Sequence, residues 1–288
     1  MEIRRKPDWL KIKLGGGENY PQTKKIVEQH HLHTICSSGK CPNIGECWSK
    51  GTATFMILGE ICTRSCKFCA TKTGKPLPVD VEEPARVAES VRLMNLKHCV
   101  ITSVDRDDLD DKGAKHWADT ITEIRNQNPN TIIEILVPDF DANKEWIDIV
   151  LESKPDVYGH NMETVERLSN QVRSRAKYPV SLEALRYAAE KGFITKSGIM
   201  VGLGETKEEV VQVMKDLRTV GCRLFTIGQY LQPTPNNLDI VEYVTPEQFA
   251  EYKKIGMELG FDNVEAGPLV RSSYMAEKTF LESHICRK

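Results

Sequence analysis

The chain has 288 residues, a length at which an α/β barrel commonly forms a single domain. Its 39 Lys and Arg residues nearly balance its 41 Asp and Glu residues, and the formal charge of −2 excludes a general electrostatic footprint for nucleic acid. No run approaches the roughly 18 apolar residues of a membrane span or the apolar stretch of a signal peptide. We therefore expect a folded cytoplasmic protein with no nucleic-acid or membrane partner.

Six of the nine cysteines lie close together near the start of the chain. Cytosolic thiols stay reduced, so clustered cysteines there more often bind metal than form disulfides. The first three, Cys36, Cys41 and Cys47, are spaced Cys-x4-Cys-x5-Cys and are called the N-terminal triple below. Three thiolates can bind three irons of a four-iron cluster and leave one iron in need of a partner. Zinc is the alternative, because three histidines within residues 30–33 are available to complete a tetrahedral site.

Beyond residue 50, short apolar runs alternate with helical patterns, which indicates repeated βα units around a parallel sheet. Helical spacing is clearest at 84–95 and 207–220, and Pro84 and Pro246 each suit a helix start. The six candidate strands are 53–59, 98–103, 131–136, 156–160, 195–201 and 223–230. Six units are fewer than the eight of a closed barrel, so we expect an α/β fold built as a partial (β/α)6 TIM-like barrel.

Three regions follow from this pattern. Residues 1–50 form an N-terminal extension that carries the N-terminal triple, residues 51–260 form the partial barrel, and residues 261–288 form a C-terminal extension. A partial barrel leaves a lateral gap, so we expect the two extensions to cover the barrel mouth.

A second group of cysteines, Cys62, Cys66 and Cys69, follows the first predicted strand with the spacing Cys-x3-Cys-x2-Cys and is called the barrel triple below. The carboxyl ends of strands are where parallel α/β folds build their sites. Three thiolates leave the fourth iron of a cubane open to a chelating ligand, such as the amino and carboxylate groups of S-adenosylmethionine. The alternatives are buried cysteines or a zinc site, although the second Cys-x2-Cys pair usual in structural zinc sites is absent.

Other predicted strands end in polar or glycine residues that suit contacts with such a cofactor. A solvated loop is the alternative at 102–108, a helix N-cap at 160–163, and a tight strand-to-helix turn at 197–205. The candidate cofactor-binding residues are Thr102, Ser103, Asn161, Glu163, Gly202 and Glu205.

The barrel triple resembles the signature of the radical S-adenosylmethionine superfamily, whose members share a partial βα barrel. Both triples together, with Arg271-Ser-Ser-Tyr274 near the C-terminus, are similar to the lipoyl synthases. The opening Arg5-Lys-Pro-Asp-Trp-Leu-Lys11 resembles the start of that family too, whereas the following residues 13–18 depart from it. Without the resemblance, Arg271-Ser-Ser-Tyr274 would be interpreted as a surface tail.

The resemblance implies two [4Fe-4S] clusters and S-adenosyl-L-methionine as cofactors. The barrel triple would hold the cluster whose electron cleaves S-adenosylmethionine to a radical. The N-terminal triple would hold an auxiliary cluster that donates sulfur, with Ser273, rather than Ser272, as its fourth protein ligand. A serine oxygen is a hard ligand, so its bond to iron should be replaced more easily than a thiolate bond. The implied reaction inserts two sulfur atoms at C6 and C8 of an octanoyl chain carried on a lysine.

The implied partners are octanoylated lipoyl carrier domains, on the E2 subunits of 2-oxoacid dehydrogenases and on the glycine cleavage H protein. Cleavage of the sulfonium needs an external electron, for which we expect a flavodoxin or ferredoxin type donor. Three rival functions remain: another radical sulfur-inserting enzyme such as a biotin synthase-like protein, an iron-sulfur electron carrier, and a zinc-stabilised binding protein. No chemistry is assigned to Cys99, expected in the core, or to Cys222 and Cys286.

Overall fold

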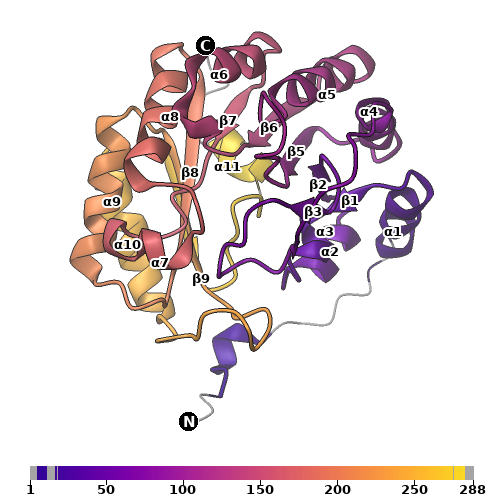
Figure 1. Ribbon diagram of the computed structural model, residues 1–288. Helices are drawn as coiled ribbons and strands as arrows, with labels where there is room; N and C mark the ends of the chain where they lie inside the picture. Colours follow the sequence, from indigo (N-terminus) through magenta and orange to yellow (C-terminus); the bar gives the residue numbers. More distant parts are fainter. Residues whose placement is uncertain (1–4, 12–16, 18, 275, 283–288) are drawn as a thin grey trace.

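The computed structural model describes residues 5–11, 17, 19–274 and 276–282, and an eight-stranded sheet curls through most of them (Figure 1). The strand order is β1-β2-β5-β6-β7-β8-β9-β10, with β1 antiparallel to β2 and every other neighbouring pair parallel. The strands are β1 (His33–Thr34), β2 (Thr54–Ile57), β5 (His98–Ser103), β6 (Ile132–Leu136), β7 (Val157–Gly159), β8 (Ile194–Val201), β9 (Leu224–Gln229) and β10 (Asn263–Gly267).

The six predicted strands are confirmed as β2 and β5 to β9, and the α/β partial barrel is confirmed as the fold class. The sheet nevertheless continues past both predicted edges. β1 has two residues, too few to give a periodic pattern, and β10 reads Asn-Val-Glu-Ala-Gly with only its first two side chains buried. β10 is therefore a seventh parallel strand inside the region that we separate as the C-terminal extension.

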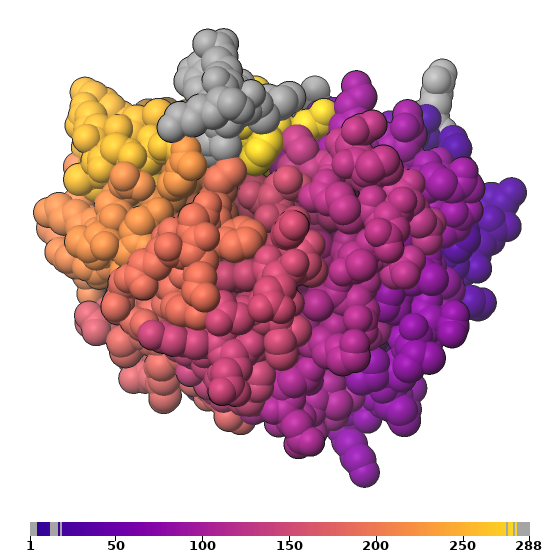
Figure 2. Space-filling model, turned by 90° about the horizontal axis from the view of Figure 1, so that it is seen from above, coloured from indigo at the N-terminus to yellow at the C-terminus, as the bar shows by residue number. Residues whose placement is uncertain are grey.

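Helices cover the outside of the sheet between successive strands, and Figure 2 shows the units following one another around the surface in chain order. The predicted helix starts are confirmed, because Pro246 is the first residue of α10 and Pro84 the second of α4. α9 opens with a capping box between Thr206 and Glu209. These helices are α4 (Glu83–Leu93), α5 (Ala114–Gln127), α6 (Lys144–Glu152), α7 (Glu166–Val172), α8 (Tyr178–Glu190), α9 (Lys207–Thr219) and α10 (Pro246–Glu258).

The N-terminal helices lie at the β2 edge of the sheet, and β10 forms the opposite edge. α1 (Tyr20–Gln29), α2 (Ile35–Ser38) and α3 (Ile44–Ser49) lie on the β2 side, whereas η1 (Asp8–Leu10) lies apart from them (Figure 1). After β10 the chain crosses close over β9, where a Cβ on Gly228 would lie 2.1 Å from the Val270 carbonyl oxygen. Only glycine allows this approach.

The last helix, α11 (Ala276–Glu282), packs at the amino ends of the strands. Phe280 is buried with Val157 and Leu224, the first residues of β7 and β9, and its ring lies edge-on to His98 at 5.8 Å. Among the described residues, no helix is both long and apolar enough to cross a membrane.

Candidate active site

A sharp turn aims the loop that carries the barrel triple. β2 ends at Ile57, and Leu58 and Gly59 then take positive φ angles of 67° and 92°. For leucine this conformation is costly, so neighbours must hold it. The buried Glu83 carboxylate accepts the Leu58 N–H at 2.7 Å and lies 2.8 Å from His116 Nε2, while Arg106 donates to the Leu58 carbonyl at 3.3 Å. The loop thus leaves the carboxyl end of β2, as the sequence predicts.

Backbone contacts on both sides fix the loop itself. Cys62 ends β3 (Ile61–Cys62), which pairs with β4 (Lys72–Thr73) beyond the loop. The Lys67 N–H donates to the Val172 carbonyl at 2.9 Å, after α7. Asn237 donates through its amide to the carbonyls of Lys67 at 3.1 Å and Cys69 at 2.9 Å. The loop is therefore clamped between two distant parts of the barrel.

The thiols of the barrel triple are surrounded by N–H donors. The N–H groups of Arg64 and Asp105 point to Cys62 Sγ at 3.4 and 3.3 Å, and the Thr71 N–H points to Cys69 Sγ at 3.4 Å. Burial raises the pKa of Cys62 to about 12, and the Asp105 carboxylate adds to the rise. Burial likewise raises the pKa of Cys69, with a smaller contribution from Cys66. The three side chains are close enough to feel one another's charge, and the N–H groups suit thiolates bound to metal.

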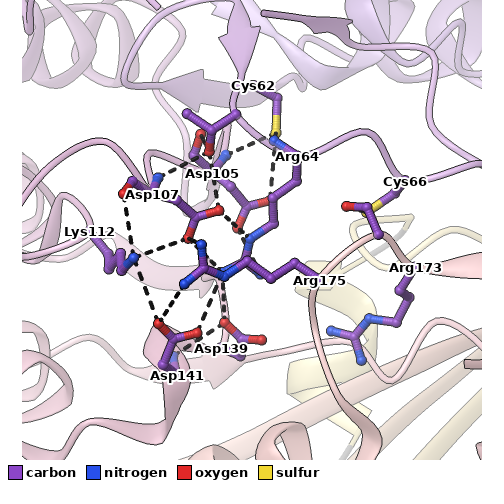
Figure 3. Close-up of polar contacts among 12 residues, drawn as sticks. Cys62, Arg64, Cys66, Asp105, Asp107, Lys112, Asp139, Asp141, Arg173 and Arg175 are labelled. Carbon is purple, nitrogen blue, oxygen red and sulfur yellow. Dashed lines mark hydrogen bonds and ion pairs between the residues drawn. The ribbon is translucent and has the colours of Figure 1, made fainter. Parts of the chain in front are cut away.

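A buried charge network lies directly behind this loop (Figure 3), and sequence reasoning missed it. The Arg64 side chain is only 4% exposed. Its guanidinium lies 2.8 Å from Asp107, 3.0 Å from Asp139 and 3.4 Å from Asp105. The sequence alone assigns Arg64 no role, because its carboxylate partners come from the ends of two other strands and leave no local pattern.

The network perturbs its members in opposite directions. Although burial opposes ionisation, hydrogen bonding and charge from Arg64 lower the pKa of Asp107 to about 2. Burial raises the pKa of Asp105, whose Oδ2 lies 3.6 Å from Cys62 Sγ. The outer edge of the network reaches the surface through Arg175, which pairs with Asp141 at 3.3 Å. Arg64 therefore ties the segment between two cysteines to β5 and β6.

A cavity of about 130 Å³ opens beside Cys66 at the carboxyl ends of β5 to β7. Its lining includes four of the predicted cofactor-binding residues, Thr102, Ser103, Asn161 and Glu163. It also includes four charged or titratable residues that we did not predict: Arg64, Asp105, His160 and Arg173. The structure therefore brings Cys66 of the barrel triple and these four candidates together around one space.

Inside this cavity, the buried side chains of Arg173 and His160 lie close to half-buried Glu163. Glu163 takes a positive φ of 67°, and two backbone hydrogen bonds hold it to β8. Its N–H donates to the Gly198 carbonyl at 3.0 Å, and its carbonyl accepts the Met200 N–H at 2.9 Å. Burial raises the pKa of Glu163. Burial and the charge of Arg173 lower the pKa of His160 to about 4, so its imidazole is neutral at pH 7.

Gly202 and Glu205 lie apart from this group. Neither lines the cavity, and the Glu205 carboxylate instead accepts the N–H groups of Gly202 at 2.5 Å and Leu203 at 2.9 Å. Gly202 has a φ of 97°, the left-handed conformation that favours glycine. These contacts favour the tight strand-to-helix turn that the sequence left open, and cofactor binding by Gly202 and Glu205 stays a prediction.

The N-terminal triple lies in a mainly apolar nook made by α2, α3 and the start of β2. Cys36 is buried with Trp48 and Ala53, and Cys41 and Cys47 pack against the same cluster. Burial raises the pKa of Cys47 to about 12, with further contributions from Cys36 and Cys41. The three thiols are therefore electrostatic neighbours.

The segment after β10 meets this nook from the far end of the chain. The Asn43 amide donates to the Leu269 carbonyl at 2.7 Å, and the Tyr274 hydroxyl lies 3.3 Å from both carboxylate oxygens of Glu46. Burial lowers the pKa of Arg271, and the Cys41 thiol opposes that effect. Residues 269–274, called the C-terminal strap below, are thus not a free surface tail.

The two serines of the strap have different surroundings. Ser272 Oγ accepts a hydrogen bond of 2.7 Å from the Asn161 amide, a residue that lines the cavity beside the barrel triple. Ser273 is half-buried between Ser272 and Tyr274. The strap therefore runs from the cavity to the N-terminal triple.

The cysteine groups are open to a cluster. Among the described residues, no three His, Cys, Asp or Glu side chains converge as one metal ion would need, and the eight described cysteines are free thiols. In a four-iron cluster each thiolate binds a different iron, so its sulfurs need not meet at one point. Cys99 and Cys222 are fully buried, and Cys286 and most of residues 13–18 lie outside the described part.

Comparisons with known proteins agree with this arrangement. Residues 56–217 match the family model described as the radical SAM superfamily. A lipoyl synthase of Bacteroides fragilis (strain YCH46) is 64% identical over 274 residues, covering 95% of each chain. A mitochondrial lipoyl synthase of Nematostella vectensis is 58% identical over 274 residues, covering 95% of this chain and 94% of that one.

Solved structures share the fold at low identity. A methylornithine synthase superposes with a TM-score of 0.58 at 11% identity, covering 84% of this chain and 74% of that chain. A maturase of the [FeFe]-hydrogenase also gives a TM-score of 0.58, at 14% identity, covering 84% and 62%. At such low sequence identity, these structural similarities are evidence for the barrel fold only and not for a shared function.

Proposed function

Because the chain belongs to the lipoyl synthase family of the radical SAM superfamily, we propose that its barrel mouth inserts two sulfur atoms, at C6 and C8, into an octanoyl chain carried on a lysine. The observation that carries this proposal is the C-terminal strap, which joins two separate cysteine sites. Ser272 contacts the cavity residue Asn161, and Tyr274 contacts Glu46 beside the N-terminal triple. An acyl chain entering between them would face both sites.

The barrel triple fits a four-iron cluster with one open iron. Cys62, Cys66 and Cys69 would be its ligands, and three N–H groups already point to two of these sulfur atoms. The open side of such a cluster would face the cavity, where Thr102, Ser103, Asn161 and Glu163 offer hydroxyl, amide and carboxyl groups to S-adenosyl-L-methionine. Half-buried Phe68 also lines this cavity and limits the access of water.

The N-terminal triple fits the auxiliary cluster. Cys36, Cys41 and Cys47 would bind three irons, and Ser273 would bind the fourth. The engagement of Ser272 with Asn161 supports the choice of Ser273, because it leaves the next hydroxyl on the strap for the metal. When bound, the two [4Fe-4S] clusters and S-adenosyl-L-methionine supply a hydrogen-abstracting radical and the sulfur.

The protein supplies geometry and exclusion of water. Arg64 and its carboxylates hold the barrel loop against β5 and β6, and the strap sets the separation between the two sites. A radical on the acyl chain survives only where water and dioxygen are excluded, and apolar lining residues such as Leu136 and Val137 serve this exclusion. The lipoyl carrier domain is the macromolecular partner.

Three further features belong to the proposal. The carriers would be E2 subunits of 2-oxoacid dehydrogenases and the glycine cleavage H protein. A flavodoxin or ferredoxin type protein would supply the electron. The location would be the cytoplasm, which the eight free thiols among the described residues support, because a reducing compartment keeps thiols free.

An anaerobic assay tests this function. Protein carrying both clusters is mixed with an octanoylated carrier peptide, S-adenosyl-L-methionine and dithionite, and the peptide is followed by mass spectrometry. We expect the peptide to gain two sulfur atoms. Formation of 5′-deoxyadenosine with no sulfur gained would refute the named substrate. Zinc without iron or sulfide in anaerobically reconstituted protein would refute the cofactors.

A further inference from the structure

One cysteine of the barrel triple lies nearer the surface than the deepest member, Cys62. Cys62 is buried, whereas Cys66 is half-buried and its thiol lies 3.5 Å from the hydroxyl of the exposed Ser174. The neighbours of Cys66 in the chain, Ser65 and Lys67, are exposed as well. Electron transfer weakens steeply with distance, and Cys66 offers a short path to this site because its thiol contacts an exposed side chain.

Cationic side chains gather around that point. The Lys67 N–H bonds to the Val172 carbonyl at 2.9 Å, which places the loop beside the segment 174–177, where every residue except Ala176 is exposed. That second segment contributes Arg175, half exposed, and Lys177, whose ammonium reaches only the Asn170 amide oxygen at 3.4 Å. We call the exposed residues Ser65, Lys67, Ser174, Arg175 and Lys177 the entry patch.

The charge of the entry patch is only partly neutralised. Arg175 pairs with Asp141 at 3.3 Å and lies 3.8 Å from Asp107. Lys67 and Lys177 take part in no ion pair among the residues that the structure describes. Two unpaired ammonium groups therefore flank the surface above Cys66, and such a patch attracts an acidic protein and speeds its association.

The entry patch also lies away from the N-terminal triple. It is built on the loop between α7 and α8 and on the barrel loop, whereas the N-terminal triple lies on α2, α3 and the turn between them, and α7 and α2 are well separated in Figure 1. A protein bound at the patch would leave the strap side open to the carrier domain.

We propose that the entry patch docks the acidic protein that donates single electrons to the cluster of the barrel triple. This rests on the function proposed above. At the patch one electron leaves the reduced donor and enters the cluster, so the donor is oxidised and the cluster reduced by one electron each. No bond forms or breaks there, and no proton is transferred.

The test compares two reductants in one variant. Protein carrying both clusters, with Lys67→Glu and Lys177→Glu combined, is mixed anaerobically with a reduced acidic flavodoxin or with dithionite, and cluster bleaching is followed by stopped flow. At low salt we expect reduction by flavodoxin to slow about tenfold or more. The two lysines attract the acidic flavodoxin, whereas two glutamates at the same positions repel it. Dithionite should reduce the variant and the parent to the same final extent.

The matched control is Lys25→Glu with Lys215→Glu, which reverses two exposed lysines on α1 and α9 and changes the net charge equally. Its rate with flavodoxin should stay within about twofold of the parent. Equal slowing in both double variants, or no slowing in the patch variant, would overturn the docking surface. If dithionite fails to support sulfur insertion in the parent itself, the proposed function fails instead.

Discussion

The two cysteine triples are held by different forces. Around the barrel triple the supports are charged and close: Arg64, 4% exposed, contacts three carboxylates, and backbone bonds fix both sides of the loop. Around the N-terminal triple the supports are apolar side chains such as Trp48 and a strap from the other end of the chain.

This difference matches what each site must do in the proposed reaction. A site that only passes electrons and orients a cofactor gains from a loop that cannot shift, and a buried ion network specifies one arrangement. A site that gives up sulfur must let a ligand go. Its oxygen ligand, Ser273, would come from the strap, which few side-chain contacts hold to the nook.

Removing one cysteine from each triple in turn should give the largest effect on the two reaction products. Cys69→Ala is expected to abolish 5′-deoxyadenosine formation, because the radical-forming cluster loses a ligand. Cys41→Ala should keep 5′-deoxyadenosine formation and lose sulfur insertion. Both products are measured by chromatography and mass spectrometry in the same anaerobic reaction, with Cys222→Ala, a buried cysteine outside both sites, as control. Equal losses of 5′-deoxyadenosine in the first two variants would contradict separate roles.

Replacing Arg64 should destabilise the loop of the barrel triple and release iron from that site alone. Arg64→Met leaves Asp107 and Asp139 without their main cation, and stranding buried charges costs about 3–5 kcal/mol of unfolding free energy. We expect iron to be lost from the barrel site, as measured by iron analysis and electron paramagnetic resonance. The iron content of Arg64→Lys should lie between those of the parent and Arg64→Met. The exposed Arg92→Met should change neither, and a matching loss there would point to a general effect.

Acidification should weaken the barrel side through His160. Its pKa is lowered to about 4 in the folded protein against about 6.5 in an unfolded chain, so only the unfolded chain takes a proton between those values. The free energy of unfolding should keep the full contribution of His160 above pH 6.5 and fall by about 3 kcal/mol toward pH 4. Denaturant unfolding at a series of pH values measures this change. His160→Gln should flatten this slope and the exposed His31→Gln should keep it. The same slope in all three proteins would remove His160 as its source.

Loosening the strap should have the smallest effect. Tyr274→Phe removes the hydroxyl that meets Glu46 and should cost about 1 kcal/mol. We expect iron of the N-terminal triple to be lost about fivefold faster on chelator challenge, with the barrel site unchanged. Tyr243→Phe, a half-buried tyrosine outside both sites, serves as the control. Faster loss from the barrel site instead would show that the strap does not belong to the nook.

Much of this arrangement was predictable because its signals are local. Strands such as His98–Ser103 read as apolar runs, and cysteine spacing within a few residues indicates a cluster without any knowledge of the fold. Thr102, Ser103, Asn161 and Glu163 line one cavity because strand ends of a parallel sheet meet at one edge, and their contacts with a cofactor stay a prediction.

The missed features depend on distant partners. Arg64 lies 75 residues from Asp139, and nothing in the loop sequence distinguishes a buried arginine from a solvated one. Arg173 follows a short helix with no strand behind it and reaches the cavity only because α7 packs beside the barrel loop. β10 was hidden by its polar composition, since a strand at a sheet edge buries few side chains.

The strap also orders events during synthesis. Asn43 and Leu269 are 226 residues apart, so the N-terminal triple is synthesised long before the C-terminal strap that contacts it. At about 5–20 residues per second, a ribosome needs roughly 11–45 seconds to cover that interval. The nook of the N-terminal triple therefore stays open on a growing chain. Its closure, and the arrival of the proposed ligand Ser273, come only after the rest of the barrel has been made.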